Sequence, residues 1–101
     1  MKRMLVRYRT KPEATEENQR LIEAVFAELR TAAPADVRYL ALKLGDGSFA
    51  HFVVADVTDG PSPLTRLAAF RAFQAGIKER CAEPPQAGDV TIVGNYRMLA
   101  E

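Results

Sequence analysis

The side chains in this sequence that could carry chemistry are few, and the first of them is its single histidine. His51 is the only histidine among 101 residues and lies within an apolar run. Because histidine titrates near neutral pH, it could act as an acid or base, or bind a metal, in a cleft. The alternative is a structural histidine at a sheet face or dimer interface. No cluster of further ligands accompanies it, and protein zinc sites use three or four ligands, so no metal site is predicted.

Asn18 and three tyrosines are the other polar candidates for a binding site. Asn18 lies on the apolar side of a predicted helix, where its amide could hydrogen-bond a substrate oxygen; it could equally cap the helix or meet a nearby backbone group. Tyr8, Tyr39 and Tyr96 could donate to a ligand, although tyrosine also suits half-buried strands. Asn18 and His51 are therefore the candidate catalytic residues, and Tyr8 and Tyr39 are candidate ligand contacts.

Three further polar residues fall on the first and last predicted strands, and they are Arg7, Asn95 and Arg97. If these strands are neighbours, the arginines could converge on a carboxylate or phenolate, or form salt bridges at the rim of a dimer. The sequence has no glycine-rich phosphate loop, no Gly-x-Ser-x-Gly and no His-Glu-x-x-His. Cys81 is the only cysteine, so an intramolecular disulfide is excluded, and a small core residue is its simplest role.

Composition and charge restrict the class of protein. Apolar residues make up 48% of the chain, and 14 basic residues nearly balance 13 acidic ones, for a net charge of +1. This balance argues against a nucleic-acid-binding protein and against a polybasic membrane patch. No apolar run approaches the ~20 residues that span a bilayer, and the N-terminus has no continuous signal-peptide core. We predict one soluble, cytoplasmic domain over residues 1–101, without nucleic-acid or membrane partners.

Apolar periodicity predicts four strands and two helices. Alternation with period two predicts a strand over residues 2–10, and helical spacing predicts a helix from Thr15 to the stop at Ala32-Ala33-Pro34. The following elements are a hairpin over 37–58, a turn over 59–63, a helix over about 63–81, a loop over 83–88 and a last strand over 89–99. The second helix carries an apolar stripe that includes Phe73, and Arg80 is assigned to its solvent side.

The hairpin turns at Gly45-Asp46-Gly47-Ser48, and Asp-Gly between apolar runs is a strong hairpin signal. A two-residue turn at Asp46-Gly47 and a four-residue loop both place Leu42 opposite His51. One face then carries Leu40, Leu42, Leu44, Phe49, His51 and Val53, and the other Tyr39, Ala41, Lys43, Ala50, Phe52 and Val54. Both faces are largely apolar, and which of them meets the helices stays open.

The order β-α-β-β-α-β predicts a ferredoxin-like α+β fold. Right-handed crossovers place both helices on one face of a four-stranded antiparallel sheet. The other face would be exposed in a monomer, yet the hairpin supplies apolar side chains to both faces. An exposed apolar patch of this size usually marks an interface. We therefore expect a homodimer in which two sheets pack face to face.

In length, element order and the two-sided hairpin, almost the whole chain resembles the dimeric α/β-barrel superfamily, which includes antibiotic-biosynthesis monooxygenase-like proteins and haem-degrading monooxygenases. The resemblance implies a dimeric α/β barrel that holds a small, flat organic ligand between helices and sheet, in a cleft lined by the stripes around Phe26 and Phe73. It implies cofactor-independent oxidation of an activated aromatic substrate. The alternatives are a non-catalytic dimeric ligand-binding or accessory domain, and a dimer without a ligand cleft.

This sequence departs from the two enzyme branches of that superfamily in two respects. It has no tryptophan, a residue that both branches use. Its histidine lies on the hairpin, whereas the haem-ligating histidine of the haem-degrading branch lies on a helix. We therefore expect no cofactor.

Overall fold

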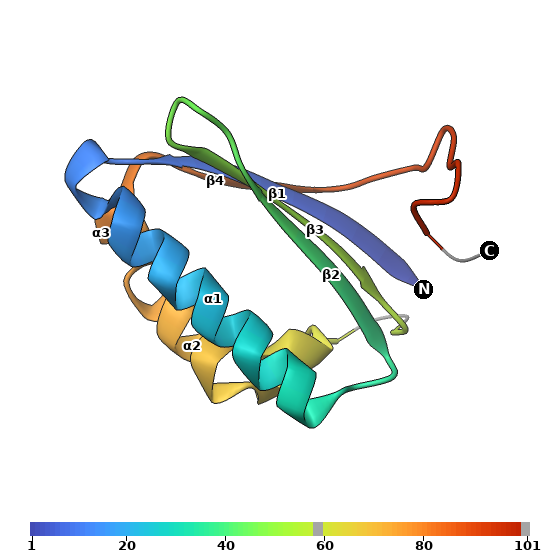
Figure 1. Cartoon of the computed structure of the whole chain (residues 1–101). Coiled ribbons are helices and arrows are strands. Elements are labelled where there is room, and N and C mark those ends of the chain that lie inside the picture. Colours follow the sequence, from blue (N-terminus) through green and yellow to red (C-terminus); the bar gives the residue numbers. More distant parts are fainter. Residues whose placement is uncertain (58–59, 100–101) are drawn as a thin grey trace.

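The computed structural model describes residues 1–57 and 60–99, and it consists of a sheet with helices packed on one of its faces (Figure 1). Along the chain the elements are β1 (Lys2–Thr10), η1 (Pro12–Ala14), α1 (Thr15–Ala32), β2 (Val37–Lys43), β3 (Ser48–Ala55), η2 (Pro63–Arg66), α2 (Ala68–Ala75), α3 (Ile77–Arg80) and β4 (Cys81–Asp89). Thr58 and Asp59, where the predicted hairpin ends and the next turn begins, lie outside the described residues.

The four strands form one antiparallel sheet in the order β2-β3-β1-β4. This topology confirms the predicted ferredoxin-like fold. β1 and α1 also begin and end at the predicted residues. α1 stops because Ala33 takes a left-handed conformation (φ 47°) and its N–H bonds back to the carbonyl oxygen of Leu29. None of the helices in the described part of the chain is long and apolar enough to cross a membrane.

The register of the β2–β3 hairpin differs from the predicted one by a single residue. Ala41, not Leu42, lies opposite His51. The turn is a three-residue loop: the N–H of Leu44 donates to the carbonyl oxygen of Ser48, and Gly47 has a φ of 84°. A three-residue hairpin loop requires a left-handed residue at this position, and glycine adopts that conformation without strain.

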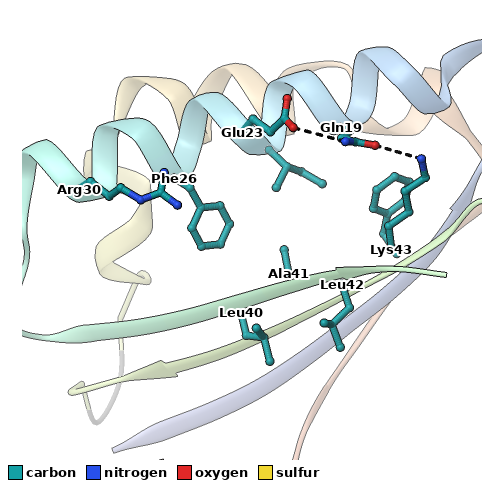
Figure 2. A pocket seen from close by; sticks show the side chains of 10 residues that line it. Gln19, Glu23, Phe26, Arg30, Leu40, Ala41, Leu42 and Lys43 are labelled. Atoms are coloured by element: carbon teal, nitrogen blue, oxygen red, sulfur yellow. Dashed lines mark hydrogen bonds between the residues drawn. The ribbon is translucent and has the colours of Figure 1, made fainter. Parts of the chain in front are cut away.

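This shift resolves which hairpin residues meet the helices, because each strand alternates between the two faces. The side chains toward the helices are those of Tyr39, Ala41, Phe49, His51 and Val53. Figure 2 shows Ala41 pointing toward α1, while Leu40 and Leu42 point to the far side of the sheet. Leu40 and Leu42 are 42% and 52% exposed in the single chain. The predicted grouping of Leu40, Leu42 and His51 on one face is therefore wrong.

The second predicted helix is divided into three short helical segments. Leu67 has an extended backbone (φ −88°, ψ 128°), which separates η2 from α2. The carboxylate of Glu28, on α1, accepts hydrogen bonds from the N–H groups that begin α2. Gly76 separates α2 from α3, and a Cβ at this position would lie 3.1 Å from a guanidinium nitrogen of Arg80. Tertiary contacts, which have no local signature, thus set these boundaries.

The last strand lies earlier in the chain than predicted. β4 covers residues 81–89, most of which were predicted as a loop, and residues 91–99 form no strand. Prolines 84 and 85 are tolerated because β4 is an edge strand and its register against β1 shifts between Arg7 and Arg9. A 2.6 Å salt bridge joins Arg9 to Glu83 in this region. The N–H of Val90 donates to the carbonyl oxygen of Arg3, near the start of β1, so little of β1 remains for the residues after Val90 to pair with.

Candidate functional site

A chain of buried hydrogen bonds crosses the interior between the helices and the sheet. Nε of Arg80 donates to Oδ1 of Asn18 at 3.0 Å, and Nδ2 of Asn18 donates to the hydroxyl of Tyr8 at 2.9 Å. That hydroxyl is 2.8 Å from Nε2 of His51. Nδ1 of the same imidazole is hydrogen-bonded to the hydroxyl of Tyr39. The five residues come from α3, α1, β1, β3 and β2, so the folded sheet and two of the helices are needed to bring them together.

Four of these five side chains are almost fully removed from water. The exposed fraction is 0% for Asn18, 4% for His51, 5% for Tyr8 and 7% for Arg80. Among the described residues, every buried side-chain nitrogen and oxygen has a hydrogen-bond partner. Because water does not reach these groups, each can keep its bonding only through its protein partners. We call these five residues, Arg80, Asn18, Tyr8, His51 and Tyr39, the polar network.

Arg80 was predicted on the solvent side of its helix, and that prediction is wrong. Its guanidinium donates to the carbonyl oxygen of Phe73 at 2.6 Å and lies 5.3 Å from the centre of the Phe73 ring. Both of its hydrogen-bond acceptors, in Phe73 and Asn18, are neutral oxygens. The sequence carried a usable signal, because Phe73, Ile77 and Arg80 follow the i, i+4, i+7 spacing of one helical face.

A small cavity lies against the sheet end of the polar network. Its volume is about 140 Å³, and its lining comprises Val6, Tyr8, Tyr39, His51, Val53, Phe70, Phe73, Gln74, Ile77 and Pro85. The His51 ring lies 5.4 Å from that of Tyr8 and 5.5 Å from that of Phe73, measured between ring centres. An apolar protein cavity of about 150 Å³ is known to hold benzene. The cavity therefore has the size of one six-membered ring, and we call it the histidine cavity.

A second, wider cleft of about 400 Å³ lies between α1 and β2 (Figure 2). Phe26 points into this cleft, and its rim carries Lys43, whose Nζ donates to Gln19 at 3.0 Å, with Gln19 bonded in turn to Glu23. The ring of Tyr39 packs against that of Phe26 with centres 4.7 Å apart. The structure thus places Phe26 and Phe73 beside two different spaces. No residue of the polar network lines the wider cleft.

Burial determines the protonation states of the network. Removal from water lowers the pKa of His51 to about 4, so the imidazole is neutral at pH 7. Burial raises the pKa of both Tyr8 and Tyr39 well above that of free tyrosine, so both hydroxyls keep their protons. At neutral pH the site therefore offers hydrogen-bond donors and a neutral imidazole, and it contains no anionic group of its own.

The low pKa of His51 predicts a specific loss of stability in acid. The imidazole pKa in the unfolded chain is about 6.5, and folding lowers it to about 4, so the unfolded state binds more protons between these values. The contribution is fully present above pH 6.5 and is lost as the pH falls toward 4, by about 3 kcal/mol in total. Urea unfolding at pH 7, 6, 5 and 4 gives the free energy of unfolding of the wild type and of His51→Gln. This free energy should fall more steeply with decreasing pH in the wild type, and an equal dependence on pH in the two proteins would contradict the burial argument.

The three residues proposed to converge on a carboxylate are not brought together. Arg7 lies in β1 opposite Gln86, whereas Asn95 and Arg97 lie beyond the sheet. Asn95 bonds within its own segment, for example to the carbonyl oxygen of Leu99. In the described part of the chain, no group of three or more histidine, cysteine and acidic residues is arranged to hold a metal ion.

No protein-family model matches this sequence, and no curated protein matches it either. Solved structures do match its backbone. One is a candidate antibiotic biosynthesis monooxygenase from Nitrosomonas europaea, with a TM-score of 0.74, 15% identity, and coverage of 93% of this chain and 100% of that one. Another is a variant of SnoaB, a cofactor-independent oxygenase from Streptomyces nogalater, with a TM-score of 0.66, 15% identity and coverage of 94% and 95%. The fold is that of the antibiotic biosynthesis monooxygenase-like proteins.

The monooxygenase-like fold gives the histidine cavity its position. The cavity lies between the sheet and the helices, and its lining residues come from both. At 15% identity the similarity concerns the path of the backbone, and the polar network is a property of this chain's own side chains. Any activity must therefore be argued from those side chains.

Proposed function

We propose that this protein binds a small, flat aromatic molecule in the histidine cavity and oxidises it with molecular oxygen without a cofactor. The observation that carries the proposal is that polar and apolar groups line the same cavity. The polar network reaches the wall of the cavity through Tyr8, His51 and Tyr39, and the remaining wall is largely apolar. A small number of polar groups in an apolar pocket is typical of ligand sites. The volume of about 140 Å³ favours a single ring over a fused ring system.

The chemistry that suits this site is the stabilisation of an electron-rich phenolate. A phenolate can transfer an electron to oxygen more readily than the neutral phenol can. A protonated tyrosine hydroxyl in a site shielded from water would stabilise the negative charge on such an oxygen. SnoaB, which is described as a cofactor-independent oxygenase, has the same fold, and this supports the proposed type of reaction.

The alternative is a ligand-binding or accessory domain without catalysis, and one observation favours it. With a pKa of about 4, His51 is a weak base at neutral pH, so it is poorly suited to remove a phenolic proton. A substrate would have to ionise readily by itself. Binding without oxidation would follow if it does not.

We also infer a homodimer formed through the face of the sheet that the helices leave uncovered. Leu40, Leu42 and Phe52 lie on this face. A groove of about 540 Å³ separates it from residues 90–99, whose exposed apolar side chains include Tyr96 and Met98. Exposed apolar surface of this extent is typical of an interface, and a two-fold dimer is the commonest assembly that would cover it.

Filling the histidine cavity tests the proposed function. Val53→Phe should lower the affinity for hydroquinone, measured by calorimetry under nitrogen, by at least about tenfold, or about 1.4 kcal/mol, because the added ring takes the ligand's space. Ala41→Phe, which places the same ring in the wider cleft, is the matched control and should change the affinity by less than about twofold. The opposite pattern would move the site to the wider cleft.

Oxygen uptake then separates the two functions. Under air, the wild type should consume oxygen with hydroquinone faster than buffer alone, and Val53→Phe should not. Binding under nitrogen without oxygen uptake under air would select the non-catalytic alternative. An absence of binding by the wild type would contradict both.

A further inference from the structure

The hydrogen bonds of the polar network have a fixed direction from donor to acceptor, because one of its members can only donate. A guanidinium has no acceptor atom, so the atom of Asn18 that faces Arg80 must be the amide oxygen. The amide nitrogen of Asn18 then faces Tyr8 and donates to its hydroxyl. Arg80 thus fixes which way the buried amide points.

The same reasoning extends to the imidazole. The Tyr8 hydroxyl accepts from Asn18, and its own proton needs an acceptor because the side chain is 5% exposed. In residues 1–57 and 60–99 the only further partner of this hydroxyl is Nε2 of His51, at 2.8 Å. Nε2 must therefore accept. A neutral imidazole with an accepting Nε2 carries its proton on Nδ1.

The direction continues to the wall of the histidine cavity. The Nδ1–H of His51 donates to the oxygen of Tyr39, which leaves the hydroxyl proton of Tyr39 unused by His51. No other acceptor for this proton lies among the side chains and backbone groups that the structure describes. Tyr39 is half-buried, and its hydroxyl is bonded to His51, which also lines the histidine cavity, so a ligand in that cavity could accept this proton.

We propose that Arg80 orients the whole network and that the Tyr39 hydroxyl is the group that donates to the ligand. The ligand is accordingly a planar single-ring molecule with an oxygen that can accept this hydrogen bond, in a carbonyl, a phenol or a phenolate. Arg80 is a positioning residue in this scheme, since it acts through Asn18, Tyr8 and His51. The identity of the ligand oxygen rests on the proposed function, whereas the direction of the network does not.

The direction can be read from the histidine without any ligand. His51 is the only histidine, so the ¹⁵N spectrum of its imidazole needs no assignment. We expect a protonated Nδ1 and an unprotonated Nε2 at pH 7, which is the form that free histidine populates less in water. A protonated Nε2 in the wild type would overturn the proposal.

Substitutions at Arg80 test its positioning role. Arg80→Lys keeps a residue that can only donate and should retain the proton on Nδ1. Arg80→Gln can donate or accept, so Asn18 is free to turn over, and we expect both tautomers. Arg20→Gln, at an exposed arginine of α1, should leave the spectrum unchanged. If Arg80→Gln folds, as judged by circular dichroism, and keeps the proton wholly on Nδ1, the role of Arg80 is refuted.

A pair of planar isosteres tests the ligand. Acetophenone carries a carbonyl oxygen where α-methylstyrene carries a methylene group, and neither can donate. The wild type should bind acetophenone about tenfold more tightly, and Tyr39→Phe should bind both equally. Equal affinities in the wild type would overturn the assignment of Tyr39 and leave aromatic binding intact. If neither compound binds, the proposed function fails and the assigned ligand with it, while the tautomer of His51 still decides the direction of the network.

Discussion

Replacing Arg80 with methionine is expected to lower the free energy of unfolding by about 3 kcal/mol. Methionine keeps most of the length of the side chain and removes every donor. Oδ1 of Asn18 and the carbonyl oxygen of Phe73 would then lose their bonds to the guanidinium in a region that water does not reach. A buried acceptor without a partner costs about 1–3 kcal/mol, and two are created here. Urea unfolding at pH 7 measures the change.

The same substitution at an exposed arginine is the control. Arg66 donates to both carboxylate oxygens of Asp36, at 2.9 and 2.7 Å, but the two side chains are 62% and 38% exposed. Surface ion pairs of this kind contribute about 1 kcal/mol or less, because water replaces the lost partner. Arg66→Met should therefore cost much less than Arg80→Met. Equal losses would show that the buried chain of hydrogen bonds contributes no more than a surface pair.

Replacing Leu42 with aspartate is expected to separate the proposed dimer while leaving the subunit folded. Leu42 is 52% exposed and points away from the helices, so a carboxylate there is solvated in a single chain (Figure 2). In a two-fold interface the substitution occurs twice, and each charge would be buried without a partner. We expect the dissociation constant to rise by at least about 100-fold, or about 2.8 kcal/mol. Analytical ultracentrifugation across a range of concentrations measures this constant.

Ala27→Asp is the matched control for the dimer experiment. Ala27 is an exposed residue of α1, and α1 lies on the other face of the sheet (Figure 1), so the variant should remain dimeric. Circular dichroism should show native secondary structure in both variants. A wild-type protein that is monomeric at micromolar concentration would contradict the proposed interface, and so would a Leu42→Asp variant that stays dimeric.

The parts of the fold that follow from local periodicity could be predicted from the sequence. β1 alternates with Leu5 as the one apolar residue on its polar side, and α1 has an apolar stripe with a proline shortly after its end. The predicted bounds of both elements were correct. The Asp-Gly signal correctly placed a hairpin between β2 and β3. Element order then led to the ferredoxin-like topology, because right-handed crossovers leave few arrangements.

Features that depend on contacts between distant residues could not be read in the same way. The loop length of the hairpin depends on Gly47 adopting a left-handed conformation, and a change of one residue exchanges the faces of one strand relative to the other. β4 contains two prolines, which usually indicate a loop, and it is a strand because it lies at the sheet edge against β1.

The residues of the candidate site also differ in whether they could be predicted from the sequence. Asn18, Tyr8, His51 and Tyr39 were chosen from residue type, and the structure joins them through hydrogen bonds. Arg80 was missed, since a charged side chain is rarely buried. It is buried here because two neutral oxygens accept its hydrogen bonds and an aromatic ring packs against it. Those partners come from α1 and α2. Local pattern therefore predicted the elements and the reactive residue types, whereas burial, the order of the hydrogen bonds and the size of the cavity arise when the helices close over the sheet.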